Sequence, residues 1–73
     1  MVHEYFKKDF ENFKILIQLN PVDFRILELT IDANNAVVKR EIQAYEDIYE
    51  DLKEDEFTKS SPLEFNLHLK GVR

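Results

Sequence analysis

The stretch NAVVKREIQAYEDIYEDLKED (residues 35–55) decides the fold expected for this chain. Its apolar side chains recur at steps of four and three residues, which is the spacing of one face of an α-helix; they are Val38, Ile42, Tyr45, Tyr49 and Leu52. We therefore predict one long amphipathic helix over residues 35–55, with polar side chains of residues 32–35 capping its first turn. Glu41 would lie within the apolar side of this helix, so its carboxylate must be paired or must reach solvent.

The second half of this stretch is strongly acidic. Residues 45–56 (YEDIYEDLKEDE) contain seven carboxylates and one lysine. Most of the carboxylates fall on the polar side of the predicted helix, where solvent exposure accounts for them. Several like-charged pairs lie four residues apart, however, and each costs roughly 0.2–0.5 kcal/mol. Two interpretations remain open, a solvated helix face or a charged surface that binds a partner through Asp47, Glu50, Asp51 and Glu54.

Residues 14–32, upstream of the predicted helix, indicate a β-hairpin. Residues 14–19 (KILIQL) are a short apolar run typical of a buried strand, and residues 27–32 (LELTID) alternate between apolar and polar. The intervening residues 20–23 (NPVD) suit either a tight turn or the start of a helix. The alternation that follows favours the turn, so we predict two antiparallel strands joined there.

The two ends of the chain give one further element each. Phe6, Phe10 and Phe13 follow the spacing of one helix face and predict a short helix over residues 3–13. Residues 62–71 (PLEFNLHLKG) alternate apolar and polar side chains, which predicts a half-buried strand.

These elements give the order α-β-β-α-β in a single small domain, residues 1–73. We predict a two-layer α+β fold in which one long and one short helix cover a three-stranded, mainly antiparallel sheet. A right-handed crossover through the long helix gives the strand order 2-1-3. Residues 14–19 then occupy the central strand.

This arrangement places Leu16, Phe24 and Ile26 together on the other face of the sheet. Either the first helix or a terminus covers these apolar groups, or they form a surface for a partner. A chain of 73 residues has a small core, and two edge strands in a small sheet invite pairing with a second copy. We therefore expect a non-enzymatic protein that acts through protein–protein association, as a homodimer or homo-oligomer or as an accessory subunit.

The alternative function is an acidic inhibitor or antitoxin-like protein whose acidic helix imitates nucleic acid at a basic site of its partner. The formal net charge of −5 argues against nucleic acid as a ligand of this chain, because phosphate binding needs clustered Lys and Arg. No apolar run is long enough to cross a membrane, and Lys7 and Lys8 interrupt the N-terminal apolar residues. We therefore predict a soluble, cytoplasmic protein.

Catalysis, cofactor binding and metal binding are not expected. The chain has no cysteine, and its two histidines, His3 and His68, are far apart in the sequence. Few residues could therefore form a catalytic pair of nucleophile and base. A single glycine rules out glycine-rich phosphate loops. Residues 32–34 begin like a calcium-binding loop, but Val37 stands where such a loop needs glycine.

Overall fold

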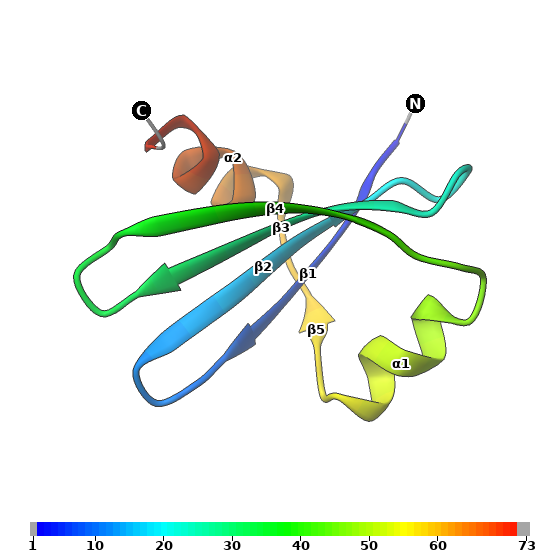
Figure 1. The fold of residues 1–73 in the computed structure, drawn as a ribbon, viewed down its shortest axis with the longest axis horizontal. Coiled ribbons are helices and arrows are strands. Elements are labelled where there is room, and N and C mark those ends of the chain that lie inside the picture. Colours follow the sequence, from blue (N-terminus) through cyan, green and yellow to red (C-terminus); the bar gives the residue numbers. More distant parts are fainter. Residues whose placement is uncertain (1, 72–73) are drawn as a thin grey trace.

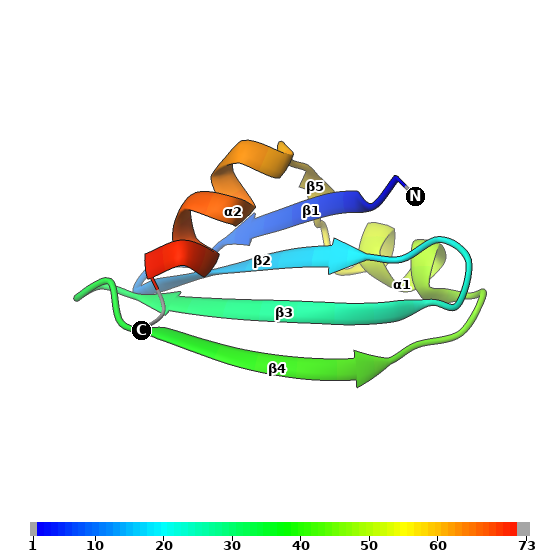
Figure 2. The same ribbon diagram turned by 90° about the horizontal axis from the view of Figure 1, so that it is seen from above.

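The computed structural model describes residues 2–71, which form an antiparallel sheet with a helix on each face (Figures 1 and 2). The elements in chain order are β1 (Glu4–Asp9), β2 (Phe13–Leu19), β3 (Arg25–Asp32), β4 (Val37–Gln43), α1 (Ile48–Glu54), β5 (Thr58–Lys59) and α2 (Pro62–Gly71). The five strands lie in the order β4-β3-β2-β1-β5, and all neighbours are antiparallel. The α+β class is confirmed, whereas the predicted three-stranded sheet of order 2-1-3 is wrong.

The predicted hairpin of residues 14–32 is present as β2 and β3. The Asn20 N–H donates to the Arg25 carbonyl, and the Phe24 N–H donates to the Asn20 carbonyl, each at 2.9 Å. Phe24 has a φ of 61°, in the left-handed region that tight turns often require. Residues 20–23 therefore form the tight turn rather than the start of a helix, and β2 is the central strand of the five.

The predicted long helix is wrong over its first half, which is the strand β4. The Asp32 carboxylate accepts the backbone N–H groups of Asn34 and Ala36, at 2.8 and 3.0 Å. Asn35 adopts a φ of 64°, which asparagine tolerates better than most residues. The side chain expected to cap a helix thus closes a turn that sends the chain back along β3.

The misleading spacing has a simple geometric cause. A step of four residues returns to the same side in a strand as well as in a helix, so Val38 and Ile42 satisfy both patterns. Within the predicted range, Ile48–Glu54 alone is assigned as α-helix. It follows a turn in which the Ile48 N–H donates to the Tyr45 carbonyl at 2.9 Å. Glu41 lies exposed on β4 and not on the apolar side of a helix.

The helix predicted for residues 3–13 is also wrong, because these residues form β1 and the turn into β2. The Phe10 N–H donates to the Phe13 carbonyl at 2.8 Å, and the two rings stack with their centroids 4.4 Å apart. Phe10 and Phe13 therefore contact each other across a hairpin turn, whereas Phe6 pairs with Ile17 and is buried in the core.

The strand predicted for residues 62–71 is wrong in turn, because these residues form the helix α2. The Glu64 N–H donates to Ser61 Oγ at 3.2 Å, and Pro62 is the first residue of the helix, so serine and proline together start it. In a helix, residues two apart point to nearly opposite sides. Phe65 is accordingly buried against the sheet, whereas Leu63 and Leu67 are exposed to solvent.

The hydrophobic core lies on both faces of the sheet. On one face Leu52 of α1 packs with Ile17 of β2, and on the other Phe65 of α2 packs with Leu16. Leu16 and Ile17 are consecutive residues that point to opposite faces, and both are buried. The predicted two-layer arrangement is therefore wrong, and the described residues form three layers: helix, sheet and helix.

The position of α2 predicts unequal effects for two of its apolar residues. Phe65→Ala should lower the free energy of unfolding by about 3–5 kcal/mol, because it leaves a cavity between α2 and the sheet. Leu67→Ala is the matched control and should change it by about 0.5 kcal/mol or less, since that side chain is exposed. Urea denaturation followed by circular dichroism measures both. Similar large losses in the two variants would contradict the helix and support a strand.

Candidate functional site

The outer edge of β4 is the longest open strand edge of the described sheet (Figure 2). No described strand pairs with this side of β4, which has seven residues, and the side chains of residues 38–41 are exposed. The opposite edge belongs to β5, which has two residues. An open strand edge presents unpaired backbone N–H and C=O groups that another strand can bind.

The hydrogen bonds at the two ends of β4 show which of its residues face outward. The Asp32 N–H donates to the Ala36 carbonyl at 3.1 Å, and the Ala44 N–H donates to the Phe24 carbonyl at 2.9 Å. The β3–β4 register between these points is unbroken. Because successive residues of a strand direct their backbone groups to opposite edges, the even-numbered residues bond to β3. The outward-facing residues are Val37, Lys39, Glu41 and Gln43.

The side chains of β4 carry charges of both signs. Arg40 faces Glu28 across the β3–β4 pair, with Arg40 Nε 3.8 Å from Glu28 Oε1. Lys39 and Glu41 point to the opposite face from Arg40, and neither makes an ion pair within residues 2–71. Their charges are therefore available to a neighbouring chain.

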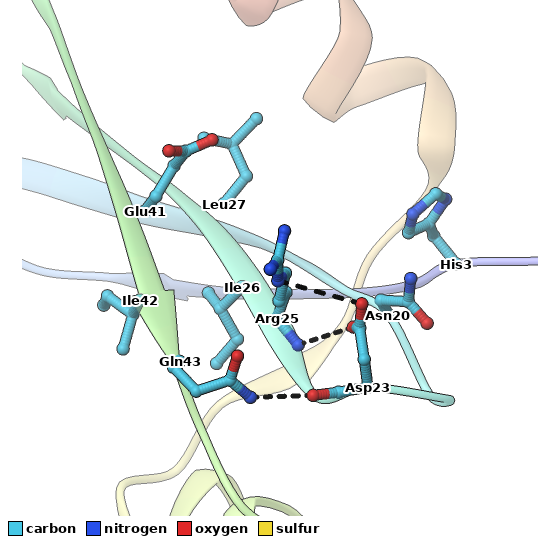
Figure 3. A pocket seen from close by; sticks show the side chains of 9 residues that line it. All are labelled: His3, Asn20, Asp23, Arg25, Ile26, Leu27, Glu41, Ile42 and Gln43. Carbon is cyan, nitrogen blue, oxygen red and sulfur yellow. Dashed lines mark hydrogen bonds and ion pairs between the residues drawn. The ribbon is translucent and has the colours of Figure 1, made fainter.

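An open hollow of about 570 Å³ borders one end of β4 (Figure 3). Its lining residues come from β3, β4, the β2–β3 turn and the N-terminal segment; they are His3, Asn20, Asp23, Arg25, Ile26, Leu27, Glu41, Ile42 and Gln43. Several of its polar groups bind one another, since the Arg25 N–H donates to Asp23 Oδ1 at 3.0 Å and Gln43 Nε2 donates to the Asp23 carbonyl at 2.7 Å. Figure 3 shows His3 and Glu41 at opposite sides of the hollow. The hollow therefore does not bring the histidine and this carboxylate together.

Two observations concern metals and membranes. In the part of the chain that the structure describes, no group of three or more His, Asp or Glu side chains is arranged to hold a metal ion. Neither α1 nor α2 is long and apolar enough to cross a bilayer.

The structure does not bring Leu16, Phe24 and Ile26 together as one exposed patch. Leu16 is buried beneath α2, where the β2–β3 register pairs it with Leu29. Ile26 is buried on the opposite face, in the cluster that α1 covers, and Phe24 packs partly buried against that cluster. Leu16 and Ile26 therefore pack inside the protein's own core, and Phe24 packs against it, rather than forming one exposed surface for a partner.

The structure does gather the four predicted acidic residues. Asp47 precedes α1, and Glu50, Asp51 and Glu54 lie within it. All four side chains are exposed, while Leu52 is the buried residue of the helix. The acidic groups thus form a solvent-facing surface beside the sheet.

A polar cluster that the sequence analysis did not anticipate joins α2 to the sheet. Glu64 Oε1 lies 3.6 Å from Lys7 Nζ of β1, and Oε2 lies 3.4 Å from Lys14 Nζ of β2. Ser60 Oγ donates to the same carboxylate at 3.1 Å. Burial by itself raises the pKa of Glu64, but the serine hydrogen bond and the two lysines outweigh it and hold the pKa below its ordinary value.

The Glu64 cluster predicts a dependence of stability on pH. Because the folded-state pKa is lowered, the stabilisation is present above the ordinary glutamate pKa of 4.5 and is lost as the pH falls through the lower folded value. Glu64→Gln should lower the free energy of unfolding by about 1 kcal/mol at pH 7. The difference from the wild type should shrink as the solution is acidified below pH 4.5. Urea titrations at several pH values test this, and a difference that stays constant with pH would contradict it.

Comparison of the chain with protein-family models, with curated proteins and with solved structures finds no match. The geometry defines the class: a small α+β protein in which the described residues form an antiparallel sheet with one long, open edge. Sequence analysis missed this edge because it assigned β4 to a helix. The consecutive β-branched residues Val37 and Val38, directly after a turn that contains Asp32, Asn34 and Asn35, are the signal that favours a strand there.

Proposed function

We propose that this protein acts by association with another protein chain, which adds a strand to the free edge of β4. Strand addition is a common mode of protein recognition, in which backbone hydrogen bonds supply affinity and alternate side chains supply specificity. The observation that best supports this proposal is the row of outward-facing backbone N–H and C=O groups along β4, a strand of seven residues.

Other features of the described residues support association less well. Leu16 and Ile26 are buried, and several polar groups of the hollow bind one another. Leu63 and Leu67 are exposed on the outer side of α2, but the β4 edge offers both backbone groups and uncompensated charge. The partner is a second copy or a different protein for which this chain is an accessory subunit. The cytoplasmic location expected from the sequence stays a prediction.

A proline in β4 tests strand addition. Lys39→Pro removes an outward-facing N–H and leaves the β3–β4 hydrogen bonds in place, because proline is tolerated on an edge strand. We expect this variant to stay folded and to lose its partners. Glu46→Pro is the matched control, since Glu46 is the second residue of the turn closed by Tyr45 and Ile48, where proline is favoured.

The measurement is a pull-down from cell lysate together with light scattering of each purified variant, with circular dichroism to check the fold. Partners retained by the folded Lys39→Pro variant would contradict the proposal.

A second candidate function is binding of a basic protein through the acidic surface of α1, which imitates nucleic acid. The exposure of Asp47, Glu50, Asp51 and Glu54 favours it. Replacing these four residues by Asn and Gln should then abolish binding of a basic partner, and binding by the parent chain should fall steeply with added salt. The same pull-down at low and high salt tests this. Partners that the neutralised variant retains would rule the second candidate out.

A further inference from the structure

We infer that the chain that pairs with β4 is a second copy of this protein, aligned antiparallel about Arg40. The inference rests on the proposed function, because it names the partner of the same edge. Three features of β4 support it: the direction of its backbone groups, the order of its charges and the positions of its two most central apolar residues.

The backbone restricts which residues can face one another. In an antiparallel pair, residues that exchange hydrogen bonds must both direct their backbone groups toward the partner. The odd-numbered residues of β4 face outward, so each must lie opposite an odd-numbered residue of the second copy. Registers centred on Lys39, Arg40 or Glu41 all satisfy this condition, and the side chains distinguish between them.

The register centred on Arg40 matches both charge and polarity. It places Lys39 opposite Glu41 of the second copy, and the twofold symmetry repeats this pair. It also places Val38 opposite Ile42 of the second copy, in a non-hydrogen-bonded pair whose side chains approach closely. Opposite-charge and β-branched cross-strand pairs both stabilise sheets.

The neighbouring registers lack these matches. Centring the pair on Lys39 places the two Lys39 side chains together and Val38 opposite Arg40. Centring it on Glu41 places the two Glu41 side chains together and Ile42 opposite Arg40. Like charges directly opposite each other are destabilising, so the register centred on Arg40 is preferred.

The symmetry axis places the two Arg40 residues side by side. Arg40 of each chain already faces Glu28 of its own β3, with Nε 3.8 Å from Oε1. The row across the dimer is then Glu28, Arg40, Arg40 and Glu28, so each arginine has a carboxylate on its other side. The Arg40 side chain is 69% exposed, and solvent screens the repulsion further.

The pairing closes at two copies. An interface around a twofold axis uses the same surface of both chains, so each dimer consumes both β4 edges and joins the two sheets into one. Charged side chains on an edge strand ordinarily discourage pairing. In β4 the signs of Lys39 and Glu41 are ordered so that they repel in the shifted registers and attract in the one centred on Arg40.

Cysteine cross-linking tests the register directly, because the chain has no cysteine of its own. In the Arg40→Cys variant the two cysteines form a non-hydrogen-bonded pair with a Cα separation of about 4.5 Å, which suits a disulfide. In the control Val38→Cys the two cysteines are offset by four residues, roughly 13 Å along the strands. We expect mild oxidation to give a covalent dimer of Arg40→Cys and little of Val38→Cys. Equal cross-linking of both variants would overturn the register.

Charge reversal provides a second test that does not depend on cysteine. Lys39→Glu and Glu41→Lys each place like charges opposite one another twice per dimer, and each should weaken dimerisation about tenfold or more. The double variant exchanges the two charges and should restore the affinity of the parent chain. Light scattering over a range of concentrations measures all four proteins against the monomer mass of 8.8 kDa. A double variant as weak as the single variants would overturn the inference.

The outcomes separate the inference from the proposed function. A parent chain that stays monomeric at every soluble concentration, together with no cross-linking of Arg40→Cys, overturns the second copy as partner. Strand addition by a different protein then stands if the lysate pull-down recovers a partner that Lys39→Pro loses and Glu46→Pro keeps. If the Lys39→Pro variant keeps every partner that the parent chain binds, the proposed function itself is overturned.

Discussion

The structure depends on one strand, β2, whose consecutive residues are buried on both faces of the sheet. Leu16 is 1% exposed on the side of α2, and Ile17 is 4% exposed on the side of α1. Burying a side chain of this size stabilises the fold by about 1.5–3 kcal/mol, so neither face can be left open to water. One helix cannot cover both faces. The need to cover β2 twice therefore explains why the sheet carries a helix on each side.

Covering the centre of the sheet leaves its margins less protected. The core residues of α1 and α2 pack mainly against side chains of β1, β2 and β3. β5 extends the sheet beyond β1, whereas β4 extends it beyond β3 and ends the sheet there (Figure 1). The same arrangement that buries Leu16 and Ile26 thus exposes the backbone of β4. The edge that we propose for association lies at this margin, where no side chain of β4 is fully buried.

Local sequence patterns predicted the β2–β3 hairpin correctly and misassigned segments on both sides of it. The alternation of residues 27–32 was interpreted correctly because consecutive β-branched residues accompany it. The alternation of residues 62–71 was interpreted incorrectly as a strand. These residues form a helix in which Phe65 faces the sheet while Leu67 faces solvent, and Ser61 with Pro62 provides the helix start. In residues 35–55 a four-residue step suited both strand and helix, and the choice depended on whether Asp32 capped a helix or closed a turn. Glu50, Asp51 and Glu54 are exposed on a helix as the charge pattern predicted, although the helix is much shorter than predicted and binding through these residues stays a prediction.

The sequence by itself determined the α+β class, the hairpin of β2 and β3, the central place of β2 and the exposure of the acidic residues near α1. These properties follow from short-range signals, namely the apolar run of β2, the turn residues after it and the concentration of carboxylates. The tertiary structure alone decided that residues 37–43 and 4–9 are strands, that α2 is a helix and which edge stays open. The physical reason is that marginal segments of six to ten residues take the conformation that buries most apolar surface against β2 and β3. The amount of surface buried depends on contacts between residues that are far apart in the chain.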